Sequence, residues 1–300
     1  MSYSTEHTDQ ILKKIEKRLR ASAEVYQCIP QKAGRPLPNL LELKKIVGLA
    51  KEIFFPGFFS DSDMIPATPA VTLHLQLESL TAMMIEQIAN GLYFFSEKSA
   101  ETCEDDAPEL ALTFMERIPE IKRLLCTDVQ GMFDNDPAAK SYGEVIICYP
   151  SIQAMIHYRI AHELLLLGVP VLPRIITEMA HSDYGIDIHP GAHIGEYFSI
   201  DHGTGVVIGE TCIIGNNVHL YKGVTLGAKN FVYDERGYPI NIPRHPIIEN
   251  NVIIYSNATV LGRITIGHDS IIGGNVWLTN DVPPHSRITQ QRASTDSKIR

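Results

Sequence analysis

Two short polar motifs carry the side chains best suited to proton transfer and to binding a charged substrate. The first is Asp201-His202-Gly203-Thr204-Gly205, and the second is Arg244-His245-Pro246. An imidazole, whose ordinary pKa is about 6.5, can take a proton from a hydroxyl group near neutral pH. A planar guanidinium can bind a carboxylate through two hydrogen bonds at once. These two motifs are therefore the first candidates for a functional site.

Both motifs interrupt a repeat of six residues, which must position them. Neither a helix period of 3.6 residues nor a strand period of two predicts a phase held every six positions. A repeat this short is typical of a parallel β-helix, with three hexads in each coil and a core shared between coils. Small or β-branched residues often precede the aliphatic position by two, and Gly often follows it. The aliphatic positions are Ile188, Ile194, Ile200, Ile208, Ile214, Leu220, Leu226, Ile248, Ile254, Val260, Ile266, Ile272 and Leu278.

The repeat breaks at two places. Ile200 and Ile208 are eight residues apart, and Leu226 and Ile248 are 22 apart. The second gap predicts that about sixteen residues leave the rod as a loop before Arg244 returns to it. Insertions in repeat proteins map to loops, often on the binding face. The break positions therefore indicate where binding occurs.

The composition indicates an ordinary soluble protein of two domains, with 300 residues, 44% of them apolar and 20% charged. A net charge of −9 and the absence of a basic stripe argue against a nucleic-acid surface. Five cysteines without a CxxC pair indicate neither a disulfide framework nor a zinc ribbon, and they fit a reducing compartment. No signal core or membrane span is evident, so we expect a cytoplasmic protein without membrane association.

Residues 1 to about 180 show amphipathic helical periodicity, with runs around 11–19, 40–53 and 77–92 and further helices near 108–125 and 150–167. The predicted domains are a helical domain at 1–182, a β-helix at 183–282 and a tail at 283–300. Within the helical half, the segment 134–138 allows two interpretations. It fits an Asp-capped turn that opens a helix with Pro at its first position, and it also fits part of a site.

The motifs together closely resemble those of serine O-acetyltransferases. The matching segments are 187–195, 200–211, 224–227 and 244–246, with 158–162 and 136–138 upstream, so the likeness covers roughly residues 130 to 285. The resemblance implies an α+β chain in which an all-helical N-terminal domain precedes a left-handed parallel β-helix with one extruded loop. It also implies a homotrimer or a dimer of trimers, and acetyl transfer from acetyl-CoA to the hydroxyl of L-serine.

The resemblance also assigns roles to residues. His202 matches the general base, Asp187 the carboxylate that orients it, and His245 a second active-site imidazole near the substrate carboxylate. Arg244 matches the residue that binds the substrate carboxylate, and Asp136 and Asp201 face its ammonium group. Acetyl-CoA would contact Gly227, Ala228, Ser256 and Gly274. His189, His193 and His219 are interpreted as mainly structural or surface residues, and no tightly bound metal or prosthetic group is expected.

Two segments depart from the family pattern. The loop from Lys229 to Pro243 is longer than the usual Gly-rich segment, and the chain ends in Ser297-Lys298-Ile299-Arg300 rather than in the terminal isoleucine that docks into O-acetylserine sulfhydrylase. We therefore do not expect that complex. L-Cysteine is isosteric with serine, which makes feedback inhibition at the same pocket a hypothesis.

Three other interpretations share parts of this pattern. A hexapeptide acetyltransferase for a sugar or antibiotic hydroxyl would keep the rod and the histidine without needing charges of both signs. A γ-class carbonic anhydrase would use the same rod with three histidines on zinc. A non-catalytic scaffold would lose no activity on substitution of His202.

Overall fold

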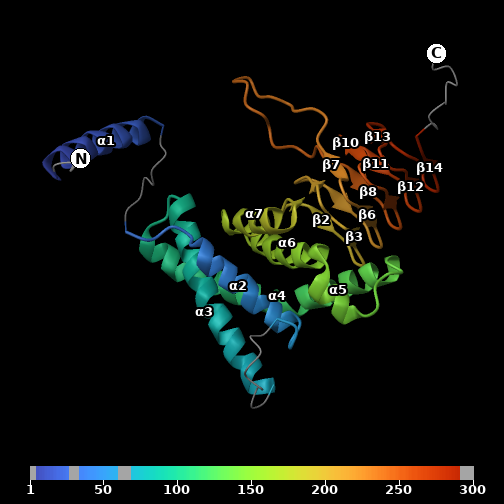
Figure 1. Cartoon of the computed structure of the whole chain (residues 1–300), viewed down its shortest axis with the longest axis horizontal. Coiled ribbons are helices and arrows are strands. Elements are labelled where there is room, and N and C mark those ends of the chain that lie inside the picture. Colours follow the sequence, from blue (N-terminus) through green and yellow to red (C-terminus); the bar gives the residue numbers. More distant parts are fainter. Residues whose placement is uncertain (1–4, 27–33, 60–68, 291–300) are drawn as a thin grey trace.

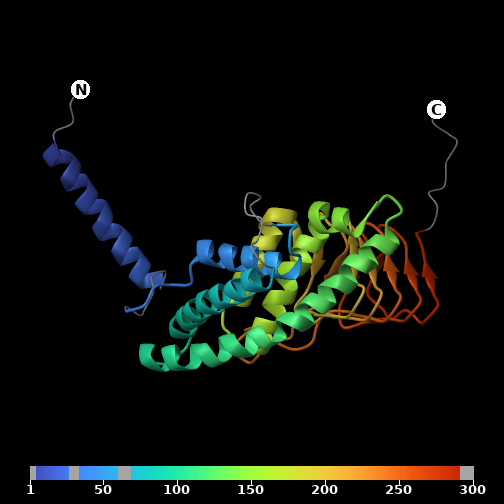
Figure 2. The same ribbon diagram turned by 90° about the horizontal axis from the view of Figure 1, so that it is seen from below.

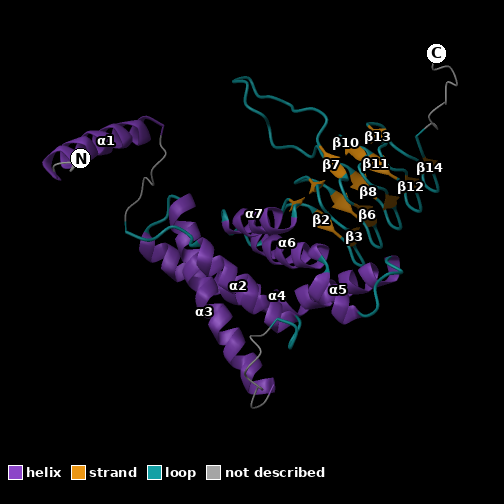
Figure 3. Ribbon diagram, viewed as in Figure 1, coloured by secondary structure: helices purple, strands orange, loops and turns teal. Residues whose placement is uncertain are grey.

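The computed structural model describes residues 5–26, 34–59 and 69–290, which form a helical region followed by a rod of short parallel strands (Figure 1). Figure 3 separates the helices from the strands by colour, and α1 stands apart from the other helices. No helix in the described ranges is both long and apolar enough to cross a bilayer. The helices are α1 (Thr5–Tyr26), α2 (Leu40–Phe54), α3 (Pro69–Phe95), α4 (Ala100–Asn135), α5 (Tyr142–Cys148), α6 (Pro150–Leu166) and α7 (Leu172–Tyr184).

Local sequence signals set several helix ends. The side chain of Asn39 accepts hydrogen bonds from the first turn of α2, and Ser99 and Ser141 do the same for α4 and α5. Pro150 occupies the first turn of α6, where its missing N–H costs nothing. Gly185 ends α7 with a φ of 68°, a left-handed conformation that glycine adopts without strain.

One interpretation of the helical half was wrong. The segment 134–138 does not open a helix, because α4 runs through Asn135 and Asp136 is its C-cap residue, with extended backbone (φ −117°, ψ 103°). The predicted helix near 108–125 is the middle of α4, which contains Pro108 and Pro119. An Asp-Pro sequence fits a helix start and a turn after a helix end equally well, so the local pattern alone could not decide.

The rod has three parallel sheets, each built from one strand per coil. Sheet A has the order β1-β4-β7-β10-β13, sheet B β11-β8-β5-β2 and sheet C β14-β12-β9-β6-β3. We call the turns from sheet C to sheet A the C–A edge, and name the A–B and B–C edges likewise. The strands are β1 (Ile186–Ile188), β2 (His193–Ile194), β3 (Ser199–Asp201), β4 (Val206–Ile208), β5 (Ile213–Ile214), β6 (His219–Tyr221), β7 (Thr225–Gly227), β8 (Ile247–Ile248), β9 (Ile253–Ile254), β10 (Thr259–Leu261), β11 (Thr265–Ile266), β12 (Ile271–Ile272), β13 (Trp277–Leu278) and β14 (Arg287–Ile288).

The six-residue repeat predicted the core of the rod. The aliphatic positions are buried in every coil except at Leu278, which is only partly covered in the last coil. The small residues two positions earlier, such as Cys212, Val252 and Ala258, are also buried. On each of its sides, a coil therefore points one aliphatic and one small side chain into the core. Because every side has this requirement, the aliphatic positions recur every six residues.

The two breaks in the repeat have the predicted consequences. Ile200 pairs with Leu220, twenty residues on, because the turn after β3 holds two extra residues. Val260 pairs with Leu226 and Ile248 with Ile214, because the extruded loop lies within the coil that separates each pair, whereas Val260 and Leu278 in the later coils pair at the regular spacing of three hexads. This loop leaves the rod between β7 and β8, at the A–B edge (Figure 1).

Helix α6 closes the first coil of the rod. The Tyr158 hydroxyl donates to the carbonyl of Ala192 at 2.6 Å, and Arg159 donates to the carbonyls of Ile194 and Gly195 at 2.7 and 2.6 Å. Arg159 also forms a buried ion pair with Asp128 of α4 at 3.0 Å. Figure 2 shows the helices other than α1 gathered toward this end of the rod. The last helix ends at Tyr184 and the last strand at Ile288, and the domain boundaries placed at 182 and 282 stay predictions.

Candidate active site

His202 lies at the C–A edge, in the turn lengthened by two residues. Its φ of 59° is left-handed, as are those of Asn257 and Asn275 in the turns of later coils at the same edge. The side chain is 71% exposed, and its Nε2 lies 3.6 Å from Oδ1 of Asp201. A Cβ on the next residue, Gly203, would come within 2.4 Å of Ile186, so this close turn requires glycine. The fold therefore presents the imidazole to solvent beside a carboxylate.

Asp136 joins this group from the end of α4. Its carboxylate accepts hydrogen bonds from the Tyr149 hydroxyl at 2.5 Å and from the Ala138 N–H at 2.8 Å. These two hydrogen bonds, with smaller contributions from the charges of His202 and His219, lower the pKa of Asp136. The same bond to Asp136 raises the pKa of Tyr149 to about 12. The structure thus brings Asp136 at the end of α4 close to Asp201 and His202 of the rod.

His219, which the sequence pattern indicated to be mainly a structural or surface residue, is buried near this group. It is 3% exposed, and its Nδ1 lies 2.6 Å from Oγ of Ser199, one coil below. Burial lowers the pKa of His219, and the nearby carboxylates of Asp201 and Asp136 oppose that effect. Its Nε2 has no hydrogen-bond partner among the described residues. Only the twenty-residue register between β3 and β6 could have revealed this position.

The second motif lies at the A–B edge, where the extruded loop returns to the rod. His245 is 7% exposed, and its Nδ1 accepts a hydrogen bond from the Thr211 N–H at 3.1 Å, so the ring proton lies on Nε2. Burial and the neighbouring Arg244 lower the pKa of His245 to about 4, which keeps the ring neutral at pH 7. A Cβ at Gly209 would lie 2.0 Å from the ring, so only glycine leaves room for it.

Arg244 is held in place by two side chains that the sequence motifs did not single out for a role. Its guanidinium donates to Glu210 at 2.6 Å and to Asn241 at 2.7 Å. Burial alone would raise the pKa of Glu210, but hydrogen bonds from Arg244 and Asn241 lower it overall. The guanidinium is therefore fixed at the base of the extruded loop and remains 22% exposed.

Asp187 lies in β1, on sheet A, between the two edges. Its carboxylate lies within 4.8 Å of ligand atoms of Glu178 and His181. In the described part of the chain the carboxylate that pairs with His202 is that of Asp201, so the hydrogen bond from His202 to Asp187 stays a prediction.

The predicted site residues fall on two edges of one rod. Within the described residues, no hydrogen bond or ion pair joins Arg244 or His245 to His202 or Asp136. The positions predicted for acetyl-CoA divide in the same way. Gly227 and Ala228 lie at the A–B edge, whereas Ser256 and Gly274 lie one above the other at the C–A edge. In a single chain the predicted site residues therefore form two separate groups.

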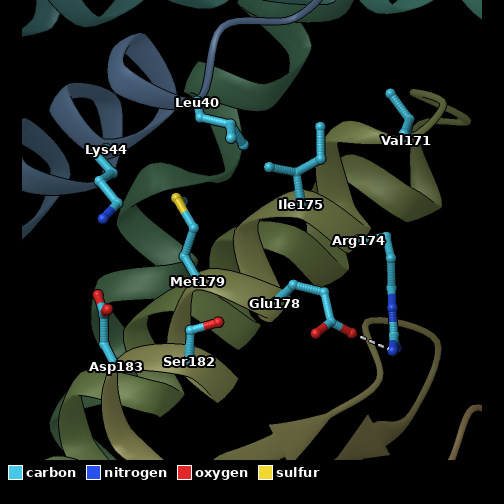
Figure 4. Close-up of a pocket in the computed structure, with 9 residues that line it drawn as sticks. All are labelled: Leu40, Lys44, Val171, Arg174, Ile175, Glu178, Met179, Ser182 and Asp183. Carbon is cyan, nitrogen blue, oxygen red and sulfur yellow. Dashed lines mark ion pairs between the residues drawn. The ribbon is translucent and has the colours of Figure 1, made fainter.

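A separate cavity of about 400 Å³ lies in the helical region, between α2 and α7. Figure 4 shows Leu40, Ile175 and Met179 along its apolar wall, with Arg174 and Glu178 forming an ion pair at its rim. Charged side chains of both signs line it, but none of the residues predicted to bind serine does. The cavity is therefore not the predicted serine pocket.

Two groups in the described part of the chain place potential metal ligands within 4.8 Å of one another, one of them Glu178, His181 and Asp187 and the other His268, Asp269 and His285. Neither is the three-histidine set that the carbonic anhydrase interpretation requires.

Comparison with known proteins identifies relatives of this chain. The hexapeptide model of bacterial transferases (six repeats) matches residues 245–280. A plasmid serine acetyltransferase of Synechococcus elongatus is 46% identical over 269 residues, which cover 87% of this chain and 84% of that protein. Serine acetyltransferase of Bacillus subtilis is 46% identical over 166 residues, covering 55% of this chain and 73% of the relative.

Solved structures agree with these matches. Serine acetyltransferase isoform 3 of Entamoeba histolytica, determined with cysteine, superposes with a TM-score of 0.71 at 31% identity, covering 91% of this chain and 88% of that one. The soybean enzyme complexed with serine has a TM-score of 0.54 at 26% identity, covering 82% and 95%. The helical region followed by the hexapeptide left-handed β-helix is the fold of these enzymes. The chain is an acyltransferase that belongs to the serine acetyltransferase family.

Proposed function

We propose that this enzyme transfers the acetyl group of acetyl-CoA to the hydroxyl of L-serine, giving O-acetyl-L-serine and CoA. The observation that carries this proposal is the group formed by Asp136, Asp201 and His202, in which an exposed imidazole lies beside two carboxylates from different domains. A sugar hydroxyl would not need two carboxylates at this point, whereas the ammonium group of an amino acid does.

His202 acts as the general base. The imidazole takes the proton of the serine hydroxyl while the oxygen attacks the thioester carbon. The CoA thiolate then leaves as the carbonyl re-forms, and the imidazolium gives its proton to the thiolate, which restores the base. A base of this kind contributes a factor of about 10²–10⁴ to the rate. Asp187 would orient the ring and stabilise the imidazolium, as the family motif predicts.

The remaining charges fit a zwitterion. Asp136 and Asp201 bind the ammonium group, and Arg244 binds the carboxylate. His245 is neutral and carries its proton on Nε2, so it can donate a hydrogen bond to the same carboxylate. Glu210 and Asn241 hold Arg244 in position for this contact.

The division of these residues between two edges supports a homotrimer. Sheet A lies between the C–A and A–B edges. Three rods packed with sheet A toward a threefold axis would bring the C–A edge of each copy next to the A–B edge of its neighbour. Each active site would then join His202 of one copy to Arg244 of the next.

Acetyl-CoA would lie in the groove between two copies, along Ser256 and Gly274 of one and Gly227 and Ala228 of the other. A cavity of about 260 Å³ at the base of the extruded loop supports this placement, because Lys229 and Arg263 line it beside Arg244. Since Arg244 binds the serine carboxylate, Lys229 and Arg263 are the cations that suit the phosphate groups of the co-substrate.

The first experiment follows CoA release with L-serine, L-homoserine and a panel of sugars. Turnover with L-serine in preference to the others supports the proposal, and turnover with a sugar instead would contradict it. Subunit sharing is tested by co-expressing His202→Asn with Arg244→Leu. If each site uses two copies, mixed trimers contain one site with both residues intact and regain part of the activity. If each site belongs to one copy, mixing restores nothing.

L-Cysteine should compete with L-serine for the same charged pocket, since the two differ only in the side-chain heteroatom. The Entamoeba histolytica relatives were crystallised with cysteine, which supports this proposal. An inhibition titration at fixed acetyl-CoA should show a competitive pattern against serine. No inhibition at millimolar cysteine would contradict it.

A further inference from the structure

The B–C edge contains a column of residues in the left-handed conformation, one in each coil. Their φ angles lie between 54° and 59°, and the residues are Tyr197, Asn217, Asn251, Asp269 and His285. Asn suits such a position well, because its short polar side chain tolerates positive φ. In the last two coils Asp269 and His285 stand at this position instead of Asn. The column thus changes from the amides of Asn217 and Asn251 to potential metal ligands at the C-terminal end of the rod.

Hydrogen bonds along the column orient the carboxylate of Asp269. The amide of Asn217 donates to Asn251 at 3.0 Å, and the amide of Asn251 donates to Oδ1 of Asp269 at 2.9 Å. The other oxygen, Oδ2, lies 2.7 Å from Nδ1 of His268 and 3.6 Å from Nδ1 of His285. One oxygen is therefore held by the ladder while the other faces two imidazoles.

We propose that His268, Asp269 and His285 bind one divalent transition-metal ion of the zinc type. Their three ligand atoms lie within 4.8 Å of one another, and tetrahedral zinc needs nitrogen and oxygen ligands separated by about 3.3 Å. The three side chains are 46%, 39% and 70% exposed, so they can make this small adjustment and water can complete the coordination. Two imidazoles favour zinc, nickel or copper over magnesium or calcium, which prefer oxygen ligands alone.

The hydrogen bond from Asn251 to Asp269 is the kind of support that metal ligands receive from neighbouring residues that do not themselves bind the ion. A hydrogen bond to a ligating carboxylate fixes its orientation, and loss of such a partner lowers metal affinity about 10- to 100-fold. A second hydrogen bond, from the His268 N–H to Glu249 at 2.8 Å, fixes the backbone of that ligand.

The ion would connect the last two coils. His268 and Asp269 lie in the turn between β11 and β12, and His285 lies in the turn before β14, the last strand. The B–C edge holds none of the residues that we propose for catalysis. The site would therefore stabilise the end of the rod without taking part in acetyl transfer.

The test uses the full-length protein, stripped of metal and titrated with ZnCl₂ by calorimetry, with the visible absorption of Co²⁺ as a second measurement. Asp269→Asn and His285→Asn remove one ligand each and introduce the residue that the preceding coils carry at the same φ, so the fold is kept. Asn251→Gly tolerates the same positive φ and removes the hydrogen bond to Asp269 together with the one from Asn217, without removing a metal ligand. His74→Ala is the control, since this exposed histidine has a single carboxylate neighbour, Glu78.

We expect wild type and His74→Ala to bind one ion per chain, beyond any binding at the exposed Cys126 and Cys148 that all variants share. The two ligand variants should lose at least tenfold in affinity, Asn251→Gly should lose about tenfold or more, and zinc should raise Tm only where the site is intact. Equal binding by all variants, or binding by wild type only at millimolar zinc, would overturn the proposal.

Discussion

Replacing His202 with asparagine is expected to lower kcat by about 10²–10⁴-fold, which corresponds to about 3 to 5 kcal/mol of transition-state stabilisation. Asparagine cannot take a proton from the serine hydroxyl. It does tolerate the left-handed backbone that His202 adopts, with a φ of 59°, so the turn at the C–A edge is kept. The loss therefore measures the chemistry of the imidazole rather than damage to the fold.

His285 provides a closely matched control in the same chain. It also has a φ of 59°, its side chain is 70% exposed against 71% for His202, and its ring lies 3.6 Å from a carboxylate, as does that of His202. His285→Asn should keep the activity of wild type within about twofold. Both substitutions are at exposed positions, where free energies of unfolding change by about 0.5 kcal/mol or less, so both variants should keep the Tm of wild type within a few degrees.

The assay is CoA release at saturating L-serine and acetyl-CoA, with Tm measured on the same preparations. Retention of activity by His202→Asn to within threefold of wild type would refute the assignment of the base. Equal losses in His202→Asn and His285→Asn would show that the assay reports a general effect of the substitution.

Three further predictions follow from buried contacts. Gly209→Ala should displace the ring of His245 and raise KM for serine more than it lowers kcat, because the added Cβ would lie 2.0 Å from that ring. Arg159→Met should lower the free energy of unfolding in urea by about 3 to 5 kcal/mol, because it leaves the carboxylate of Asp128 buried without its partner. Burial lowers the pKa of His157 to about 4, whereas the unfolded chain protonates this imidazole near pH 6.5. As pH falls from about 6.5 toward 4, protonation of the unfolded chain therefore lowers the free energy of unfolding. Urea unfolding at pH 7 and pH 5 should show a smaller difference for His157→Gln than for wild type.

The repeat of six was sufficient to predict the rod because its cause is local. Each coil must place an aliphatic side chain inward at every side, so the core residues and both interruptions follow from counting. His202 was found for the same reason, since it lies in the first interruption. Neither the prediction of the rod nor the choice of His202 required knowledge of contacts between distant segments.

Other parts of the site depend on such contacts. Glu210 holds Arg244 across 34 residues, and the extruded loop between them has no repeat from which its return path could be derived. His219 is buried beside Asp136 only because α4 ends there, and the direction in which a helix docks is not encoded in its own periodicity. Asp136 itself could be placed in the site only through the resemblance to a known family.

The two ends of the rod differ, and this difference bears on how its length is specified. At the first coil, Tyr158 and Arg159 of α6 donate hydrogen bonds to carbonyl groups that could otherwise accept them from another strand. At the last coil, β13 and β14 each have one side without a neighbouring strand in the described chain. Hexads contain no signal that limits their number, because every coil offers the next the same hydrogen-bonding pattern. Strands of two residues, together with Pro283 and Pro284 between them, give a poor template for a further coil or for a second rod. The number of coils is therefore determined by these terminating residues and not by the repeat.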